Sequence, residues 1–122
     1  MILFEIVYIV FCIALASVNA IYIKDGKRIY HGINGALHLI AAAGCGYLFG
    51  WWTSAVILCN TRAVFDTLLN LFRGLPFDYV PSKPKSVIDK IEKCIFGNNG
   101  ILPKVIYTTI SITLNIVYYV TN

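Results

Sequence analysis

Long runs of apolar residues, separated by short polar segments, make up most of this chain. The first run covers 2–23 and ends at a basic turn, 24–28, and the last run covers 101–120. An α-helix of about 20 apolar residues crosses the ~30 Å hydrocarbon core of a bilayer. The last run is rich in Ile, Val and Thr, which favour strands in water, but a lone strand in lipid leaves its backbone groups unpaired. We therefore expect both runs to form membrane-spanning helices.

The middle region, 29–72, is too long for one crossing, and its pattern permits two arrangements. In the first, a single long helix from about 33 to 58 is followed by an interfacial helix, which gives three spans in the whole chain. In the second, a helical hairpin has arms at 29–49 and 53–72 and a tip at 50–52.

The distribution of basic residues favours the hairpin, because Lys and Arg accumulate on the cytoplasmic side of membrane proteins. The hairpin places the basic segments 24–28 and 83–93 on one side, whereas a single middle span separates them. The tip then lies outside, uncharged and with two tryptophans, residues typical of the membrane interface. We predict an all-α integral membrane bundle with four transmembrane helices and both termini outside, with three helices as the alternative. The predicted spans are 2–23, 29–49, 53–72 and 101–120.

The composition predicts a single membrane domain, 1–122. Of all residues 58% are hydrophobic and 13% are charged, and the mean hydropathy is +0.73. Soluble domains carry roughly 25% charged residues, so this chain has too little polar surface to cover a water-soluble globule. The net charge of +4 gathers in the two basic segments and gives no indication of nucleic-acid binding. Cleavage of the first run as a signal peptide is a further alternative, although residues 1–5 lack the positive charge that such a peptide requires.

The longest polar stretch, 81–97, predicts a short helix at about 86–96, with Ser86 and Asp89 spaced as a helix-capping pair. Four aliphatic residues fall on one side of this helix: Val87, Ile88, Ile91 and Ile95. Such a helix lies on the membrane surface or, as an equal alternative, packs on the bundle as part of a solvated loop. Lysines near an anionic membrane surface each add ~1 kcal/mol of attraction, and we predict lipid contact for four of them. These are Lys83, Lys85, Lys90 and Lys93.

A polar stripe at helical spacing interrupts the third predicted span: Arg62, Asp66, Asn70 and Arg73. A charged side chain at mid-bilayer costs ~2.5–3.5 kcal/mol or more, so charged residues at this depth pair with one another or with polar neighbours. We expect Arg62 and Asp66, four residues apart, to form an ion pair.

The second predicted span carries its own stripe at four-residue spacing: Asn34, His38, Ala42, Gly46 and Gly50. The two glycines form a G-x-x-x-G motif, and small residues let helix backbones approach closely in lipid, so the last three residues of the stripe are predicted helix-packing positions. If the hairpin turns at the tryptophans, His38 lies level with Asp66, and Asn34 with Asn70. The two stripes then form one polar seam, consisting of Asn34, His38, Arg62, Asp66, Asn70 and Arg73.

One segment, 60–97, carries a longer series of residues. The series is Arg62, Asp66, Asn70, Arg73-Gly74-Leu75-Pro76, Tyr79, Pro84-Lys85-Ser86 and Asp89-Lys90-Ile91-Glu92. It resembles small polytopic membrane proteins of bacteriophages and of Bacteroidetes-type bacteria, over about a third of the chain. The resemblance implies that Arg62, Asp66, Asn70, Arg73, Gly74 and Ser86 belong to the pattern of that family, and it implies no activity.

The predicted role of the seam is structural, because polar residues join helices in many membrane bundles. We predict a non-enzymatic scaffold or partner-binding subunit in a bacterial inner membrane, with the basic loops cytoplasmic and with a second copy or a membrane protein as partner. Three alternatives stay open: a phage holin-like pore former, a proton- or ion-handling subunit that uses His38 beside Asp66, and a lipid-active enzyme. Nucleotide and metalloprotease motifs are absent from the sequence, and we predict no catalytic residue, metal or cofactor.

Overall fold

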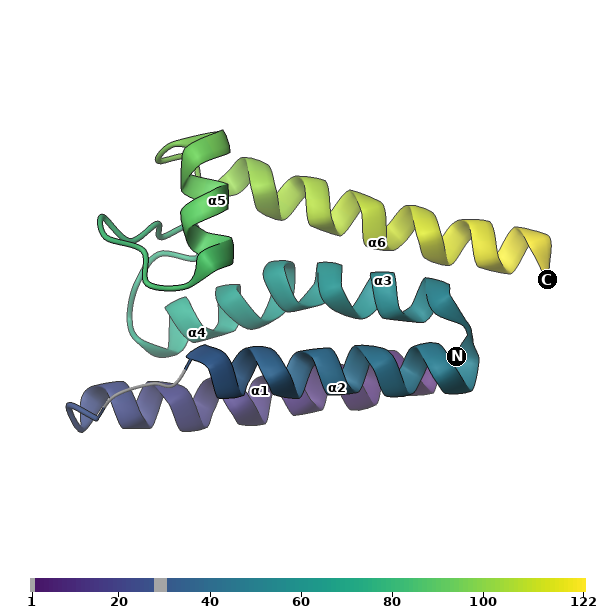
Figure 1. Ribbon diagram of the computed structural model, residues 1–122, viewed down its shortest axis with the longest axis horizontal. Helices are drawn as coiled ribbons and strands as arrows, with labels where there is room; N and C mark the ends of the chain where they lie inside the picture. Colours follow the sequence, from purple (N-terminus) through teal and green to yellow (C-terminus); the bar gives the residue numbers. More distant parts are fainter. Residues whose placement is uncertain (1, 28–30) are drawn as a thin grey trace.

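The computed structural model describes residues 2–27 and 31–122, and these are helical apart from turns and loops, with no strand among them (Figure 1). The long helices are α1 (Ile2–Lys24), α2 (His31–Phe49) and α6 (Ile101–Thr121). A fourth long helical rod joins α3 (Trp51–Asn60), the π-helical turn η1 (Thr61–Phe65) and α4 (Asp66–Phe72). A short helix, α5 (Val87–Phe96), precedes α6. The predicted all-α fold is confirmed.

Four helices are long and apolar enough to cross a membrane, as the hairpin arrangement predicts. Their ranges are Leu3–Lys24, Gly32–Phe49, Trp51–Phe72 and Ile101–Thr121. The predicted bounds differ from these by a few residues, and the first two residues of the predicted second span, 29 and 30, lie outside the described part of the chain. The third helix begins at Trp51 rather than at position 53, because the reversal is confined to Gly50.

The hairpin between α2 and α3 depends on small residues. Gly50 has a φ of +105°, which other residues rarely adopt, and the Thr53 hydroxyl donates to its carbonyl over 2.7 Å. Further from the turn, the Ser54 hydroxyl donates to the Ala42 carbonyl over 2.7 Å. A Cβ atom on Gly46 would collide with that hydroxyl. The close approach that the small residues predict is therefore present where α2 meets α3.

The rod lies between the other long helices (Figure 1): α6 is on one side, and α2 with α1 behind it is on the other. The buried stripe of α1 packs against the rod, because its residues recur every fourth position and so share one helical face. This stripe consists of Phe4, Tyr8, Cys12 and Ala16. The same core includes Val56, Ile57 and Phe65 of the rod. The outward surfaces of the long helices are largely aliphatic, as expected for helices that contact hydrocarbon.

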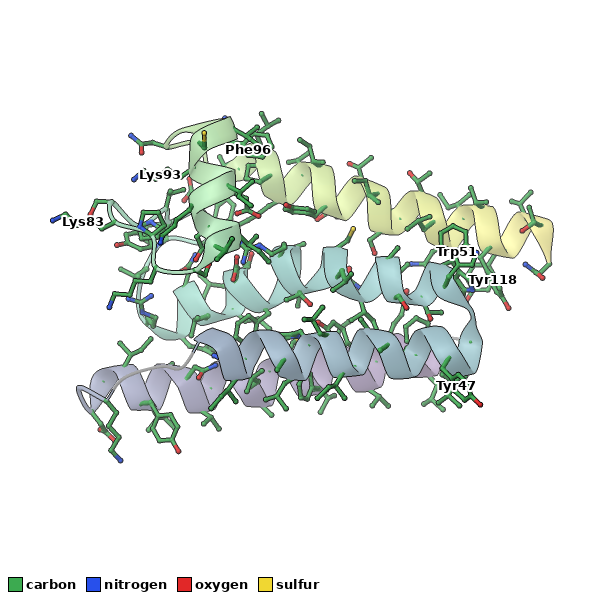
Figure 2. All side chains as sticks on the ribbon, viewed as in Figure 1. Tyr47, Trp51, Lys83, Lys93, Phe96 and Tyr118 are labelled. Atoms are coloured by element: carbon green, nitrogen blue, oxygen red, sulfur yellow. The ribbon has the colours of Figure 1, made fainter. Side chains whose placement is uncertain are left out.

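Aromatic side chains gather at the end of the bundle where the hairpin turns and both chain termini lie (Figures 1 and 2). Trp52 stacks on Tyr118 of α6 with ring centroids 4.2 Å apart, and Phe4 of α1 stacks on Phe49 at 5.8 Å. Aromatic belts of this kind mark membrane–water interfaces. The opposite end of the bundle carries α5, which lies across the direction of the long helices (Figure 1).

The glycines of α2 provide a test of the hairpin contact. We expect Gly46→Val to lower the free energy of unfolding in detergent micelles by about 1–3 kcal/mol, because the new side chain displaces Ser54 from Ala42. Gly44→Val is the matched control, since a Cβ at Gly44 meets nothing within 4 Å and should change stability by about 0.5 kcal/mol at most. Equal losses in the two variants would contradict the contact.

Candidate functional site

Arg62 is the centre of the most highly charged contact in the bundle. Its Nη1 lies 2.9 Å from Asp66 Oδ2, which is the ion pair expected four residues apart. Its Nη2 lies 2.7 Å from Asp89 Oδ1. Glu92 binds the guanidinium with both oxygens, Oε2 to Nη2 at 2.6 Å and Oε1 to Nε at 2.9 Å. We call these four residues the Arg62 cluster.

The Arg62 cluster joins three elements of the fold. Arg62 and Asp66 belong to the rod, Asp89 and Glu92 to α5, and the Tyr107 hydroxyl of α6 donates to Glu92 Oε1 over 3.0 Å. The Arg62 side chain is 14% exposed, so solvent screens these charges only weakly. Desolvation offsets much of the attraction in a buried ion pair, but removal of one partner strands the others. The cluster therefore fixes the position of α5 more than it adds net stability.

Local sequence explains why α5 presents acidic residues to the bundle. The Ser86 side chain accepts a hydrogen bond from the Asp89 N–H over 3.1 Å, so the predicted cap starts the helix. Asp89 and Glu92 are three residues apart and share a face. Lys93, one residue further round the helix, donates to the carbonyls of Pro81 and Ser82 over 2.9 and 2.8 Å and holds the preceding loop.

The aliphatic residues of α5 are open, with exposed fractions between 52% and 70% for the four residues of its apolar side. Figure 2 shows Lys83 and Lys93 at the end of the molecule that carries α5. Helical spacing puts Ile91 and Ile95 on the opposite side of α5 from Lys93. The acidic face of α5 packs on the bundle, as one of the two sequence alternatives predicts, and its aliphatic face is free.

A second polar contact lies among α1, α2 and η1. The Tyr8 hydroxyl is 2.9 Å from His38 Nδ1 and also hydrogen-bonds to Thr61, whose hydroxyl donates to the Ile57 carbonyl over 2.9 Å. His38 is 4% exposed. Its ring meets Phe65 and Phe11 edge-on, with centroids 4.8 and 5.6 Å apart. We call Tyr8, His38 and Thr61 the His38 centre.

The two contacts occupy different faces of the same π-helical turn. In η1 the Asp66 N–H bonds to the Thr61 carbonyl five residues back, and such wide turns are frequent at functional sites. Thr61 and Phe65 face His38, whereas Arg62 and Asp66, the next residue in each case, face α5. Successive residues on a helix point roughly 100° apart, so one residue separates the two directions.

The expected pairing of His38 with Asp66 is not what the structure contains. The two helices are level as expected, because the His38 ring packs on Phe65, the neighbour of Asp66. The hydrogen-bond partners of His38 are instead Tyr8 and Thr61, and Asp66 points to Arg62. The height of His38 relative to Asp66 follows from the hairpin alone. The rotation of the rod about its axis depends on α1 and α5, and the stripes of α2 and the rod carry no information about these two helices.

The other predicted seam residues lie elsewhere. The Asn70 amide is 3.4 Å from the carbonyls of Phe77 and Tyr79, so it faces the loop that follows α4. Arg73 closes α4 through its backbone N–H and is outside the Arg62 cluster. Asn34 is half-buried on α2 and outside both polar contacts. The single predicted seam is therefore divided.

Five contributors to the polar contacts have no such role in the predictions from sequence: Tyr8, Thr61, Asp89, Glu92 and Tyr107. A signal for Asp89 and Glu92 was present, because a guanidinium inside a predicted span needs more acceptors than one carboxylate provides. Tyr8 gave no comparable signal, since a tyrosine in an apolar run equally suits an interface or a core.

A groove of about 320 Å³ opens between the rod and the first half of α6. Ala63, Thr67, Phe77, Ile101, Lys104, Val105, Thr108 and Thr109 line it. Its polar lining consists of Lys104 and three threonines, and the other lining residues are apolar.

No family model, curated protein or solved structure matches the chain. The resemblance to phage and Bacteroidetes-type membrane proteins, self-association and a protein partner therefore stay predictions from the sequence.

The Arg62 cluster predicts a large difference between two arginines of one rod. Arg62→Gln strands three carboxylates and should lower the free energy of unfolding by about 3 kcal/mol, whereas Arg73→Gln, outside the cluster, should cost about 0.5 kcal/mol or less. Chemical unfolding in mixed micelles, followed by circular dichroism, measures both. Similar losses for the two variants would show that Arg62 is not the centre of the contact.

A charge exchange within the rod tests whether α5 takes part. In the double variant Arg62→Asp with Asp66→Arg, the i,i+4 pair is kept but a carboxylate faces Asp89 and Glu92. We expect this double variant to be less stable than Arg62→Gln. If the double variant has the stability of the original protein, the Arg–Asp pair within the rod is enough for stability and the contact with α5 is not needed.

Proposed function

We propose that this protein is a non-enzymatic scaffold of a membrane, which holds α5 in a fixed position at one membrane surface. One observation carries the proposal: each of the three guanidinium nitrogens of Arg62 is bound by a carboxylate. Four of the five N–H donors of the guanidinium are bound by carboxylates of its own chain, which leaves little of the group for a substrate. The position of Arg62 suits a residue that holds helices together better than it suits a catalytic residue.

The Arg62 cluster fixes the position of the aliphatic side of α5. Four membrane-spanning candidates define the direction of the bilayer normal, and α5 lies across them at one end (Figure 1). Its aliphatic residues are exposed, and the exposed lysines Lys83, Lys85 and Lys90 accompany them. An apolar face flanked by lysines is typical of a helix in the headgroup region of an anionic leaflet. The proposed occupant of this face is therefore lipid.

The proposal extends to the membrane and its sides. The end of α1, with Lys24, and the lysines of 83–93 lie at one end of the bundle, and the turn between α2 and α3 with its tryptophans lies at the other (Figures 1 and 2). By the positive-inside rule the lysine end is cytoplasmic, in a bacterial inner membrane, and both termini are outside.

Spin labels on two positions of the cytoplasmic end test the role of α5. A nitroxide at position 91 should be immobile and reached by oxygen in the lipid phase, because Ile91 belongs to the aliphatic face. A nitroxide at the exposed position 85 should be reached by a water-soluble nickel complex. In Arg62→Gln the label at 91 should gain mobility, and in Arg73→Gln it should not. Equal mobility in all three backgrounds would contradict the scaffold.

Accessibility labelling in a variant without native cysteines tests the sidedness. A cysteine at position 51 should react with an impermeant maleimide added to intact cells, and a cysteine at position 85 should react after the membrane is opened. Reaction of both from the outside would contradict a cytoplasmic α5.

A further inference from the structure

The hydrogen bonds of the His38 centre fix which ring nitrogen of His38 carries hydrogen. The Thr61 hydroxyl has one hydrogen and donates it to the Ile57 carbonyl. Thr61 must then accept from Tyr8, and Tyr8 has no second hydrogen to give. The contact between Tyr8 and His38 Nδ1, at 2.9 Å, therefore needs its hydrogen from Nδ1. In neutral His38 the other nitrogen, Nε2, is a bare lone pair.

Nε2 is buried, and among the described residues it has no hydrogen-bond partner. Buried polar atoms in native proteins are nearly always paired, so an unpaired acceptor on a residue that is 4% exposed needs an explanation. The rings of Phe65 and Phe11 pack edge-on against the imidazole. The space around the ring is thus filled by carbon atoms, and a proton is a ligand small enough to reach the lone pair.

Burial in the bundle opposes a positive His38 ring, and so does the guanidinium of Arg62, so protonation of Nε2 requires acidification. On the far side of η1, one guanidinium faces three carboxylates in the Arg62 cluster, which leaves two negative charges in excess. Lys104 of α6 lies within electrostatic range of this cluster and of Asp78 in the loop, and it offsets one charge of the cluster.

The titratable groups near the His38 centre on α1 and α2 are one carboxylic acid and two thiols. On α1, Glu5 lies one turn from Tyr8, and its Oε1 is a second buried acceptor without a partner among the described residues. Cys12 of α1 and Cys45 of α2 are near Tyr8 and are free thiols. Arg62 is the cation that opposes a charge on His38, and its own carboxylates compensate it.

We propose that His38 Nε2 is a reversible proton-binding site inside the membrane-spanning bundle. A proton from water forms an N–H bond at Nε2, and the neutral imidazole becomes an imidazolium that keeps its Nδ1–H bond to Tyr8. No other bond forms or breaks. The site is independent of the scaffold role of α5, because it uses the other face of η1.

Nitrogen-15 NMR of the protein in lipid bilayers tests the site directly. The background is His31→Asn, so that His38 gives the histidine signals. At neutral pH we expect a pyrrole-type Nδ1 and a pyridine-type Nε2, and on acidification Nε2 should move to the pyrrole-type range while the helix content stays constant. A hydrogen on Nε2 at neutral pH would overturn the proposal, as would an Nε2 that stays bare until the helices unfold.

Two variants of the hydrogen-bond chain separate proton binding from packing. Tyr8→Phe removes the nearer acceptor of Nδ1–H and leaves only Thr61 at 3.4 Å, so part of the hydrogen should move to Nε2 and the single neutral form should be lost. Thr67→Val is the control, because Thr67 makes the same type of backbone bond as Thr61, to Ala63, but lies outside the His38 centre. An unchanged spectrum in Tyr8→Phe would overturn the assigned donor order.

Discussion

A guanidinium ion at bilayer depth must be neutralised by its own chain, and the arrangement of this protein follows from that requirement. Three carboxylates collect around Arg62, and two of them come from α5, which lies outside the candidate spans. To deliver them, α5 turns its acidic face to the bundle and leaves its aliphatic face free. One electrostatic constraint thus determines both how α5 is held and which side of it stays free.

The hairpin and the four long helices were predictable from sequence because they depend on local properties. Apolar length determines the spans, and the basic segments at 24–28 and 83–93 determine which arrangement of the middle region keeps them together. Gly46 and Gly50 are where the pattern of small residues places them, since close approach and reversal need no information from distant helices. The ion pair of Arg62 with Asp66 is equally local.

The assignment of partners across the bundle was less predictable. His38 was expected beside Asp66, but the rotation of the rod is set by Tyr8 on one side and by Glu92 on the other. These residues are 30 positions away from His38 and from Arg62, respectively. A period of four residues in two helices gives their relative height and leaves their rotation open, because any helix face can be turned toward a third element.

The π-helical turn sets the rotation between the two halves of the rod. A turn closed by five residues instead of four holds one residue more than a regular α-helix. Such a bulge corresponds in genetic terms to the insertion of a single codon. Without that residue, the part of the rod that follows η1 would be turned by roughly 100° relative to α3, so a single codon decides which side chains of α4 share a face with those of α3.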